Sequence, residues 1–261
     1  MARYQLRLAY DGTDFFGFQR QGNTRTVQSV FESVLRDLGW EEESILFAGR
    51  TDTGVHALGQ VVVFSLDWRH ADELLVRAIN AKMPMDAAVR NLTRVEADFH
   101  PRYDASSRRY VYHIYQTPER DPMQDHYAWH IWPKLDVDLL NEAAKAMLGK
   151  HDFSAFGRPM KPGASTVREI FHSQWQQKGE RLEYEIEGNA FLYHMVRRTV
   201  YLLVSCAKEK ISLQALHDSV NQCTPLRSGL APAKGLVLTD VTYPLGKQEQ
   251  IDNSEILDDI A

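Results

Sequence analysis

The sequence predicts an α+β fold made of two halves, each with the element order β-α-β-β-α-β. Apolar and polar residues alternate in several short segments, which is typical of half-buried strands. In other segments, apolar residues recur at the spacing of an amphipathic helix. The two kinds of segment follow one another in the same order twice. This order is the split β-α-β pattern of ferredoxin-like folds and of RNA-recognition-motif (RRM-like) folds.

The first half is predicted to start with a strand at 4–10 and to continue with a helix at 27–38. Thr26 is placed to cap the first turn of this helix, and Gly39 is placed to end it. The remaining elements of this half are strands at 45–47 and 60–66, a helix at 71–82 and a strand at 88–95.

The second half repeats the pattern without sequence identity to the first. Its elements are a strand at 109–116, a helix at 138–148, a hairpin of strands at 167–176 and 181–187, a helix at 194–209 and a strand at 236–243. A basic linker from 98 to 108 is the natural boundary between the halves. We therefore expect one unit at 1–98 and a second at 99–247, followed by an acidic, disordered tail at 248–261.

Composition indicates a globular chain: 261 residues, 44% hydrophobic and 25% charged, are enough for a substantial core. No window contains eighteen uninterrupted apolar residues, so we expect no transmembrane helix. The N-terminus lacks the apolar block of a signal peptide. Two cysteines cannot form a disulfide framework, which points to a reducing cytoplasm.

The net charge of −5 resides in the tail, because 248–261 carries five acids and no base. The rest of the chain is neutral and can still bind phosphates where its bases gather. The basic clusters are Arg102, Arg108 and Arg109; Arg158, Lys161 and Arg168; and Arg197 and Arg198. The alternative is that these residues are solvated surface.

The segment 49–60, GRTDTGVHALGQ, places Arg50, Asp52 and His56 in a glycine-containing loop between two apolar strands. A loop held in this way can present a carboxylate at a fixed point beside a cleft. The alternative is a mobile hairpin loop in which Asp52 forms an Asx-turn and Arg50 faces water.

Two further segments carry candidate residues. In 188–198, Arg197 falls close to the apolar face of the predicted helix, where a partly desolvated guanidinium requires a carboxylate partner. In 108–115, Tyr110 lies on a strand beside arginines, where aromatic rings can stack on exposed bases. The alternatives are a surface arginine and a tyrosine packed in the core.

Other motifs do not lead to a site. Gly12 and Gly17 have the spacing of P-loop glycines, but Phe18 and Gln19 follow instead of Lys and Ser or Thr. His126 and His130 lie in an aromatic segment without regular periodicity, so we expect no zinc site there. Nothing in the sequence suggests a cofactor.

Five ordered segments together resemble the tRNA pseudouridine synthase A family, and they span the chain from about residue 4 to residue 244. They are YDGTDFFGFQRQ (10–21), AGRTDTGVHALGQV (48–61), FHPRYDASSRRYVYHIY (99–115), GNAFLYHMVR (188–197) and APAKGLVLTDVTY (231–243). Phe18 departs from the family pattern, which has Trp there, and keeps an aromatic side chain. The acidic tail has no counterpart in the family motifs.

The resemblance implies a pseudouridine synthase fold with a central cleft, formed by the two halves. It implies isomerisation of uridine to pseudouridine at positions 38–40 of the tRNA anticodon stem-loop. It also implies a homodimer that needs neither metal nor cofactor and does not associate with membranes.

The resemblance also assigns residues, and it implies that Asp52 is the nucleophile. The other assignments are the stem-opening Arg50, the base-stacking and catalytic Tyr110, the aspartate-pairing Arg197 and the pocket residue Leu236, with His56 expected to bind substrate.

Two other functions remain open from the residues alone. A non-catalytic RNA-binding protein would account for the element order and the aromatics but not for the Arg50–Asp52 loop. A hydrolase with Asp52 and His56 as a base pair would release uracil or cleave the strand.

Overall fold

The structure is a computed structural model, and it describes residues 1–244 of the 261. The acidic tail expected at 248–261 lies outside the described residues, as do residues 245–247 of the expected second unit. Within residues 1–244, no helix combines the length and the apolar character that crossing a membrane requires.

The eight predicted strands occur in the predicted order, and two short strands are present in addition. Together they are β1 Ala2–Tyr10, β2 Leu46–Phe47, β3 His56–Leu66, β4 Ala87–Arg94, β5 Ser107–Tyr115, β6 Trp129–His130, β7 Gly149–Asp152, β8 Val167–Lys178, β9 Arg181–Gly188 and β10 Leu236–Thr242.

The α-helices are α1 Val27–Asp37, α2 Asp72–Lys82, α3 Val137–Lys145, α4 Met195–Ala207 and α5 Leu213–Gln222. Two short 3-10 turns accompany them, η1 Gln124–His126 and η2 Ala233–Gly235. Thr26 caps α1 by accepting a hydrogen bond from the Ser29 amide, and Gly39 beyond the helix has φ +90°, as the sequence predicts.

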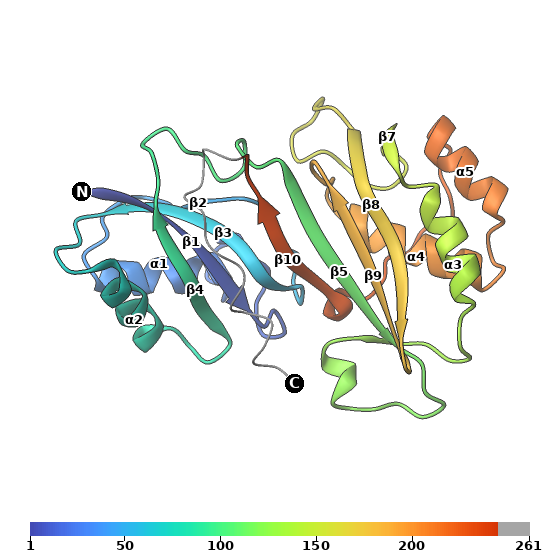
Figure 1. Ribbon diagram of the computed structural model, residues 1–261, viewed down its shortest axis with the longest axis horizontal. Coiled ribbons are helices and arrows are strands. Elements are labelled where there is room, and N and C mark those ends of the chain that lie inside the picture. Colours follow the sequence, from blue (N-terminus) through green and yellow to red (C-terminus); the bar gives the residue numbers. More distant parts are fainter. Residues whose placement is uncertain (245–261) are drawn as a thin grey trace.

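All the strands form one sheet, in the order β4-β1-β3-β10-β5-β9-β8-β7, with β2 added to β3 and β6 added to β5. The last strand of the chain, β10, lies between β3 and β5 (Figure 1). It pairs in parallel with the start of β3, where Val237 is opposite His56, and antiparallel with β5, where Leu238 is opposite Tyr110. One strand therefore brings the start of β3 close to Tyr110.

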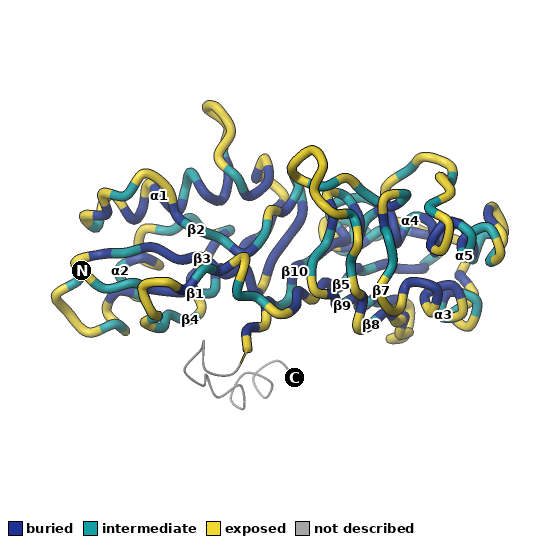
Figure 2. Tube along the Cα trace, turned by 90° about the horizontal axis from the view of Figure 1, so that it is seen from above, coloured by how far each residue is buried: buried dark blue, intermediate teal, exposed yellow. Residues whose placement is uncertain are grey.

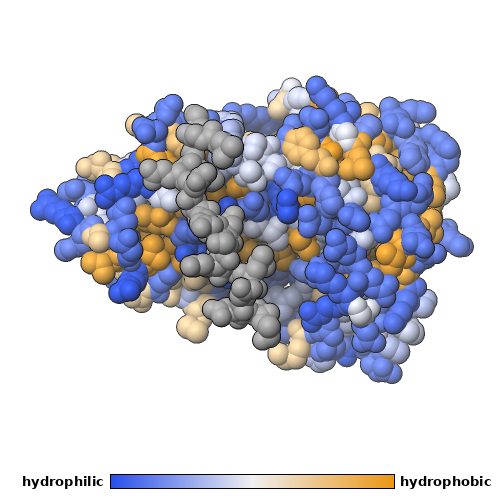
Figure 3. Space-filling model, in the orientation of Figure 1, coloured by the Kyte–Doolittle hydropathy of each residue, from blue (hydrophilic) through white to orange (hydrophobic). Residues whose placement is uncertain are grey.

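Helices α1 and α2 lie at one end of this long sheet, and α3, α4 and α5 lie at the other (Figure 1). The molecule is elongated, and buried residues follow the central strands from one end to the other (Figure 2). The sheet face over β5, β9 and β8 in Figure 3 is mostly hydrophilic. The side chain of Arg109 in β5 pairs with Glu185 and Glu187 of β9. The opposite face of β5 carries the buried side chains of Tyr110 and Tyr112.

Three features differ from the sequence-based expectation. The strand expected at 60–66 starts at His56, because its first residues pair with β1 and β10. Helix α5, the short strand β6 and the short edge strand β7 were not predicted. The two halves also share one continuous sheet, while the expected boundary near residue 98 falls in the connection between β4 and β5.

Candidate active site

The loop that carries Asp52 is held by the segment that follows β1. The hydroxyl groups of Tyr10 and Thr51 form a hydrogen bond of 2.8 Å, and the Phe18 amide donates to the Thr51 carbonyl. Gly17 lies so close that a Cβ on it would stand 2.9 Å from the same carbonyl oxygen. Backbone and side-chain contacts on Thr51 thus fix the residue next to Asp52, and the loop is not a loosely held hairpin.

Arg197, the third residue of α4, contacts Asp52 directly. Its Nη1 donates to Oδ2 of Asp52 over 2.8 Å, and its Nε donates to the Ala231 carbonyl over 2.9 Å. The two charged side chains are mostly buried, with exposed fractions of 16% for Arg197 and 20% for Asp52. The positive end of the α4 dipole adds to the stabilisation of the carboxylate. The guanidinium thus fixes the orientation of the Asp52 carboxylate.

Tyr110 and Leu236 supply apolar walls beside this ion pair. Both are buried, at 9% and 5% exposure. The Tyr110 ring meets the Phe191 ring edge-on, with centroids 5.3 Å apart. Burial raises the pKa of Tyr110 to about 12; the Arg108 charge opposes this shift, and the Asp52 charge adds a smaller part to it. The phenol therefore keeps its proton at neutral pH.

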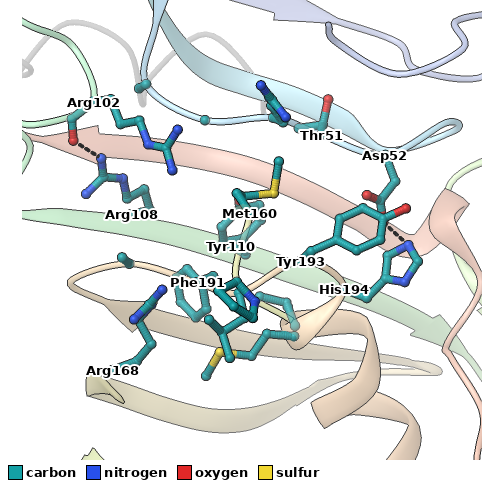
Figure 4. Close-up of a pocket in the computed structure, with 18 of the residues that line it drawn as sticks. Thr51, Asp52, Arg102, Arg108, Tyr110, Met160, Arg168, Phe191, Tyr193 and His194 are labelled. Atoms are coloured by element: carbon teal, nitrogen blue, oxygen red, sulfur yellow. Dashed lines mark hydrogen bonds and ion pairs between the residues drawn. The ribbon is translucent and has the colours of Figure 1, made fainter. Parts of the chain in front are cut away.

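These residues line one cavity of about 410 Å³. Residues from four loops, from the start of α4 and from the strands β2, β5, β8 and β10 surround it, so that it lies where the two predicted halves meet (Figure 4). Asp52 and His194 stand on one side of the cavity in Figure 4, and Arg102 and Arg108 stand on the other. The predicted residues that the structure brings together here are Arg50, Asp52, Tyr110, Arg197 and Leu236.

The cavity is rich in cations. Arg50, Arg102, Lys161 and Arg168 line it, and none of the four forms an ion pair with another described residue. Burial, and then the charge of Arg102, lower the pKa of Arg50 and of Arg168. Like charges held together without a carboxylate form a place for an anionic ligand. Arg168 also donates to the carbonyls of Ser165 and Val167 next to it in the chain. Arg108 lines the cavity as well, but it donates to three backbone carbonyls and holds the 102–106 segment.

His56 does not join this group. It is buried outside the cavity, where its Nδ1 accepts from the Gly12 amide over 3.0 Å and its Nε2 lies 3.2 Å from the Lys234 carbonyl oxygen. The His56 ring thus links its own strand to the segments at Gly12 and Lys234. Because β3 begins at His56, the side chain is turned away from the Asp52 loop. The geometry therefore gives no support to a substrate contact of His56, or to an Asp52–His56 base pair.

Two arginines of the basic clusters also lie elsewhere. Arg109 is on the opposite face of β5, paired with acids of β9. Arg198 donates to the carbonyls of Leu226 and Gly229 and anchors the segment before β10. A cluster in sequence does not stay a cluster in a strand or helix, where neighbouring residues point in different directions.

Several cavity residues had no predicted role. They are His194 at the start of α4, its neighbours Phe191 and Tyr193, and Met160 in the loop before β8. The sequence indicated the 188–198 segment and the cation cluster around Lys161 as candidates, but it did not predict that the two line the same cavity. Within residues 1–244, no group of three His, Cys, Asp or Glu side chains is placed to hold a metal ion.

The geometry can perform one kind of chemistry well. A carboxylate, oriented by an arginine, faces a cavity with an aromatic wall and cations that form no ion pair within residues 1–244. A carboxylate of this kind can act as a nucleophile in covalent catalysis. A flat ring fits against Tyr110, and a phosphate fits beside the unpaired arginines.

Comparison with known proteins leads to the same chemistry. A family model described as tRNA pseudouridine synthase matches residues 8–104 and 143–244. The tRNA pseudouridine synthase A of Colwellia psychrerythraea is 36% identical over 245 residues, which cover 93% of this chain and 94% of that protein. The tRNA pseudouridine synthase A of Shouchella clausii is 39% identical, over 93% of this chain and 94% of that protein.

Solved structures are less similar. The crystal structure of a Cbf5–Nop10–Gar1 complex matches with a TM-score of 0.34 at 10% identity, over 76% of this chain and 43% of that chain, which is too weak to bear on function. The family model and the two relatives cover most of the chain. The chain therefore belongs to the tRNA pseudouridine synthase A family of isomerases.

Proposed function

We propose that this protein converts uridine to pseudouridine at positions 38–40 of the tRNA anticodon stem-loop, with Asp52 as the nucleophile. The observation that carries the proposal is the pair formed by Asp52 Oδ2 and Arg197 Nη1 at the wall of the cavity. The family supports the reaction class. The choice of positions 38–40 rests on the motif resemblance and is the part that most needs a test.

The reaction moves one bond and needs no added group. The N1–C1′ bond of uridine breaks, a C5–C1′ bond forms, the C5 hydrogen leaves as a proton, and N1 takes up a proton. Asp52 assists by adding either to C6 of the base or to C1′ of the sugar, and it leaves again when the new bond is made. The cavity gives the detached uracil room to rotate.

The remaining residues bind and open the substrate in this proposal. Arg50 takes the place of the base that leaves the stem, Tyr110 stacks on uracil, and Leu236 packs against it. The unpaired Arg102 and Arg168 bind phosphates next to the flipped nucleotide. We assign His56 to support of the loop, because its ring faces Gly12 and Lys234.

We further infer that each half is a ferredoxin-like unit, within 1–98 and 99–247. Strand order supports this inference: the first half runs β4-β1-β3-β2 and the second β10-β5-β9-β8, so that equivalent strands occupy equivalent places. The family resemblance supports a homodimer that shares one tRNA. A cytoplasmic location accords with two unpaired cysteines, Cys206 and Cys223.

The test uses tRNA transcripts labelled with tritium at C5 of uridine. The protein should release tritium, and nucleoside analysis should find pseudouridine, which has the mass of uridine. A tRNA whose only labelled uridines lie at 38–40 should release as much as the fully labelled tRNA, and one without uridine there should release none. Free uracil or cleaved RNA would indicate a hydrolase, and binding without release would indicate a non-catalytic RNA-binding protein.

A further inference from the structure

His194 stands at the N-cap of α4 in a conformation that is unfavourable for a residue with a Cβ. Its φ and ψ are 66° and 0°, in the left-handed region. Within residues 1–244, only Glu209 and Cys223 share a positive φ without being glycine. Helix N-caps favour short oxygen-bearing side chains that bond to the first turn. The His194 side chain makes no such bond. Capping therefore does not account for this residue, and strain of this kind is typical of functional sites.

The strained backbone points the imidazole into the cavity (Figure 4). The ring stacks on Tyr193, with centroids 3.7 Å apart and planes 26° apart. Its Nε2 lies 3.4 Å from Oδ2 of Asp52. This is the same oxygen that Nη1 of Arg197 binds at 2.8 Å. Among residues 1–244, no hydrogen bond or ion pair reaches the other oxygen, Oδ1.

We propose that His194 is a positioning residue that, together with Arg197, holds Oδ2 of Asp52 and thereby selects Oδ1 as the oxygen that attacks the uridine. The inference rests on the proposed function, because it deepens the role of Asp52 there. A distance of 3.4 Å is longer than a formed hydrogen bond. Contacts of this kind commonly shorten when the substrate fills the site.

The charges around the ring favour a neutral donor. The groups that face it are Asp52 from the loop, Arg197 from its own helix, Arg158 from the loop before β8, and the Tyr193 ring. Burial lowers the pKa of His194 below 6.5, the charges of Arg197 and Arg158 lower it further, and the Asp52 charge partly opposes them. At neutral pH the imidazole is therefore uncharged, and it can donate an N–H to the carboxylate without adding a second full positive charge beside it.

Three variants separate this role from a purely structural one. His194→Gly removes the donor and relieves the strain, because glycine adopts positive φ freely. His194→Gln keeps a donor near the position of Nε2 but cannot take up a proton. Glu209→Gly is the matched control, since it relieves the same kind of strain at the far end of α4, outside the cavity.

The measurements are thermal unfolding, tRNA affinity and the single-turnover rate of tritium release. We expect His194→Gly to be at least as stable as the wild type, to bind tRNA within twofold, and to react about tenfold more slowly, the effect of one lost hydrogen bond to a charged group. We expect the wild-type rate to decline as the pH falls through the lowered pKa of His194. His194→Gln should keep most of the rate and lose this decline. Glu209→Gly should gain stability with no change in rate. A wild-type rate in His194→Gly, or equal losses in the Gly and Gln variants, would overturn the proposal.

A second measurement does not depend on activity. The ring of His194 can be titrated by NMR in the wild type and in Asp52→Asn. Since the Asp52 charge raises the pKa of His194, its removal should lower that pKa. An unchanged pKa would show that the ring does not face the carboxylate and would overturn the proposal. If the wild type released no tritium, the proposed function would fail, while this titration would still decide the contact.

Discussion

Nη1 of Arg197 lies 2.8 Å from Oδ2 of Asp52, although 145 positions separate the two residues in the chain. The carboxylate comes from the loop before β3, and the guanidinium comes from the first turn of α4. β10, which is inserted between β3 and β5, brings these elements together. The ion pair thus links the two parts of the sheet and places the Asp52 carboxylate at the cavity.

Replacement of Asp52 tests the nucleophile. Asp52→Asn keeps the size of the side chain and removes the charge, so tritium release should become undetectable. Binding of tRNA should persist, because phosphate contacts dominate affinity. Asp52→Glu should fail almost as completely, since one methylene misplaces the attacking oxygen. Substantial release by a folded Asp52→Asn protein would remove Asp52 from the mechanism.

Arg197→Met should leave the Asp52 carboxylate without its main partner. We expect the single-turnover rate to fall about ten- to a hundredfold, the size of a lost charge-assisted hydrogen bond. Affinity for tRNA should change little. The matched control is a double-mutant cycle in thermal unfolding: with Asn at position 52, the Arg197 substitution should destabilise less. Additive effects in the cycle would mean that the two side chains do not interact.

Tyr110→Phe keeps the ring and its edge contact with Phe191 but removes the hydroxyl. If the phenol handles a proton during the isomerisation, the rate should fall at least tenfold at unchanged affinity. Tyr112→Phe, on the same strand face, is the control. Its hydroxyl donates to the Pro232 carbonyl outside the cavity, so this variant should lose about 1 kcal/mol of stability and no activity. A wild-type rate in Tyr110→Phe would leave stacking as its only role.

Arg102→Gln tests whether the unpaired cations bind phosphate. We expect weaker tRNA binding and a salt slope, log affinity against log salt concentration, that is smaller by about one. The rate at saturating tRNA should stay near wild type. Arg109→Gln should leave the slope as it is, because Arg109 is paired with Glu185 and Glu187 on the opposite sheet face. Equal slopes for the Arg102 variant and the wild type would exclude the phosphate contact.

His56 predicts a pH dependence of stability. Burial lowers its pKa below 6.5, and the nearby Asp11 charge opposes only part of the shift. Below pH 6.5 the unfolded chain takes up a proton that the folded ring resists, so unfolding free energy should fall as the pH decreases from 6.5 toward the folded pKa. His56→Asn should be less stable at pH 7.5 but show a shallower loss between pH 6.5 and 5.5. Parallel curves for the two proteins would contradict this account.

Much of the fold follows from local pattern in the sequence. Alternation in 4–10 and helical spacing in 27–38 determined β1 and α1, because each periodicity reports which side of an element is apolar. Leu213, Leu216 and Val220 after Ser212 have the spacing of an amphipathic helix, so α5 was predictable from the sequence although it was not among the predicted elements. β7 has no such pattern, since its GKHD sequence becomes a strand only by pairing with the edge strand β8.

The motif resemblance proposed candidate residues for the site, and the tertiary structure decided which of them lie together. The sequence offered Asp52 and His56 as neighbours in one loop, and it offered Arg197 only as a guanidinium in need of a carboxylate. The insertion of β10 beside His56 buried that ring against Gly12 and Lys234, and it brought Arg197 to Asp52. Periodicity in the sequence shows which side of a helix or strand is apolar. Which residues far apart in the chain come into contact depends instead on the order in which the strands pair. That order is set by packing of the whole core, and no local pattern contains it.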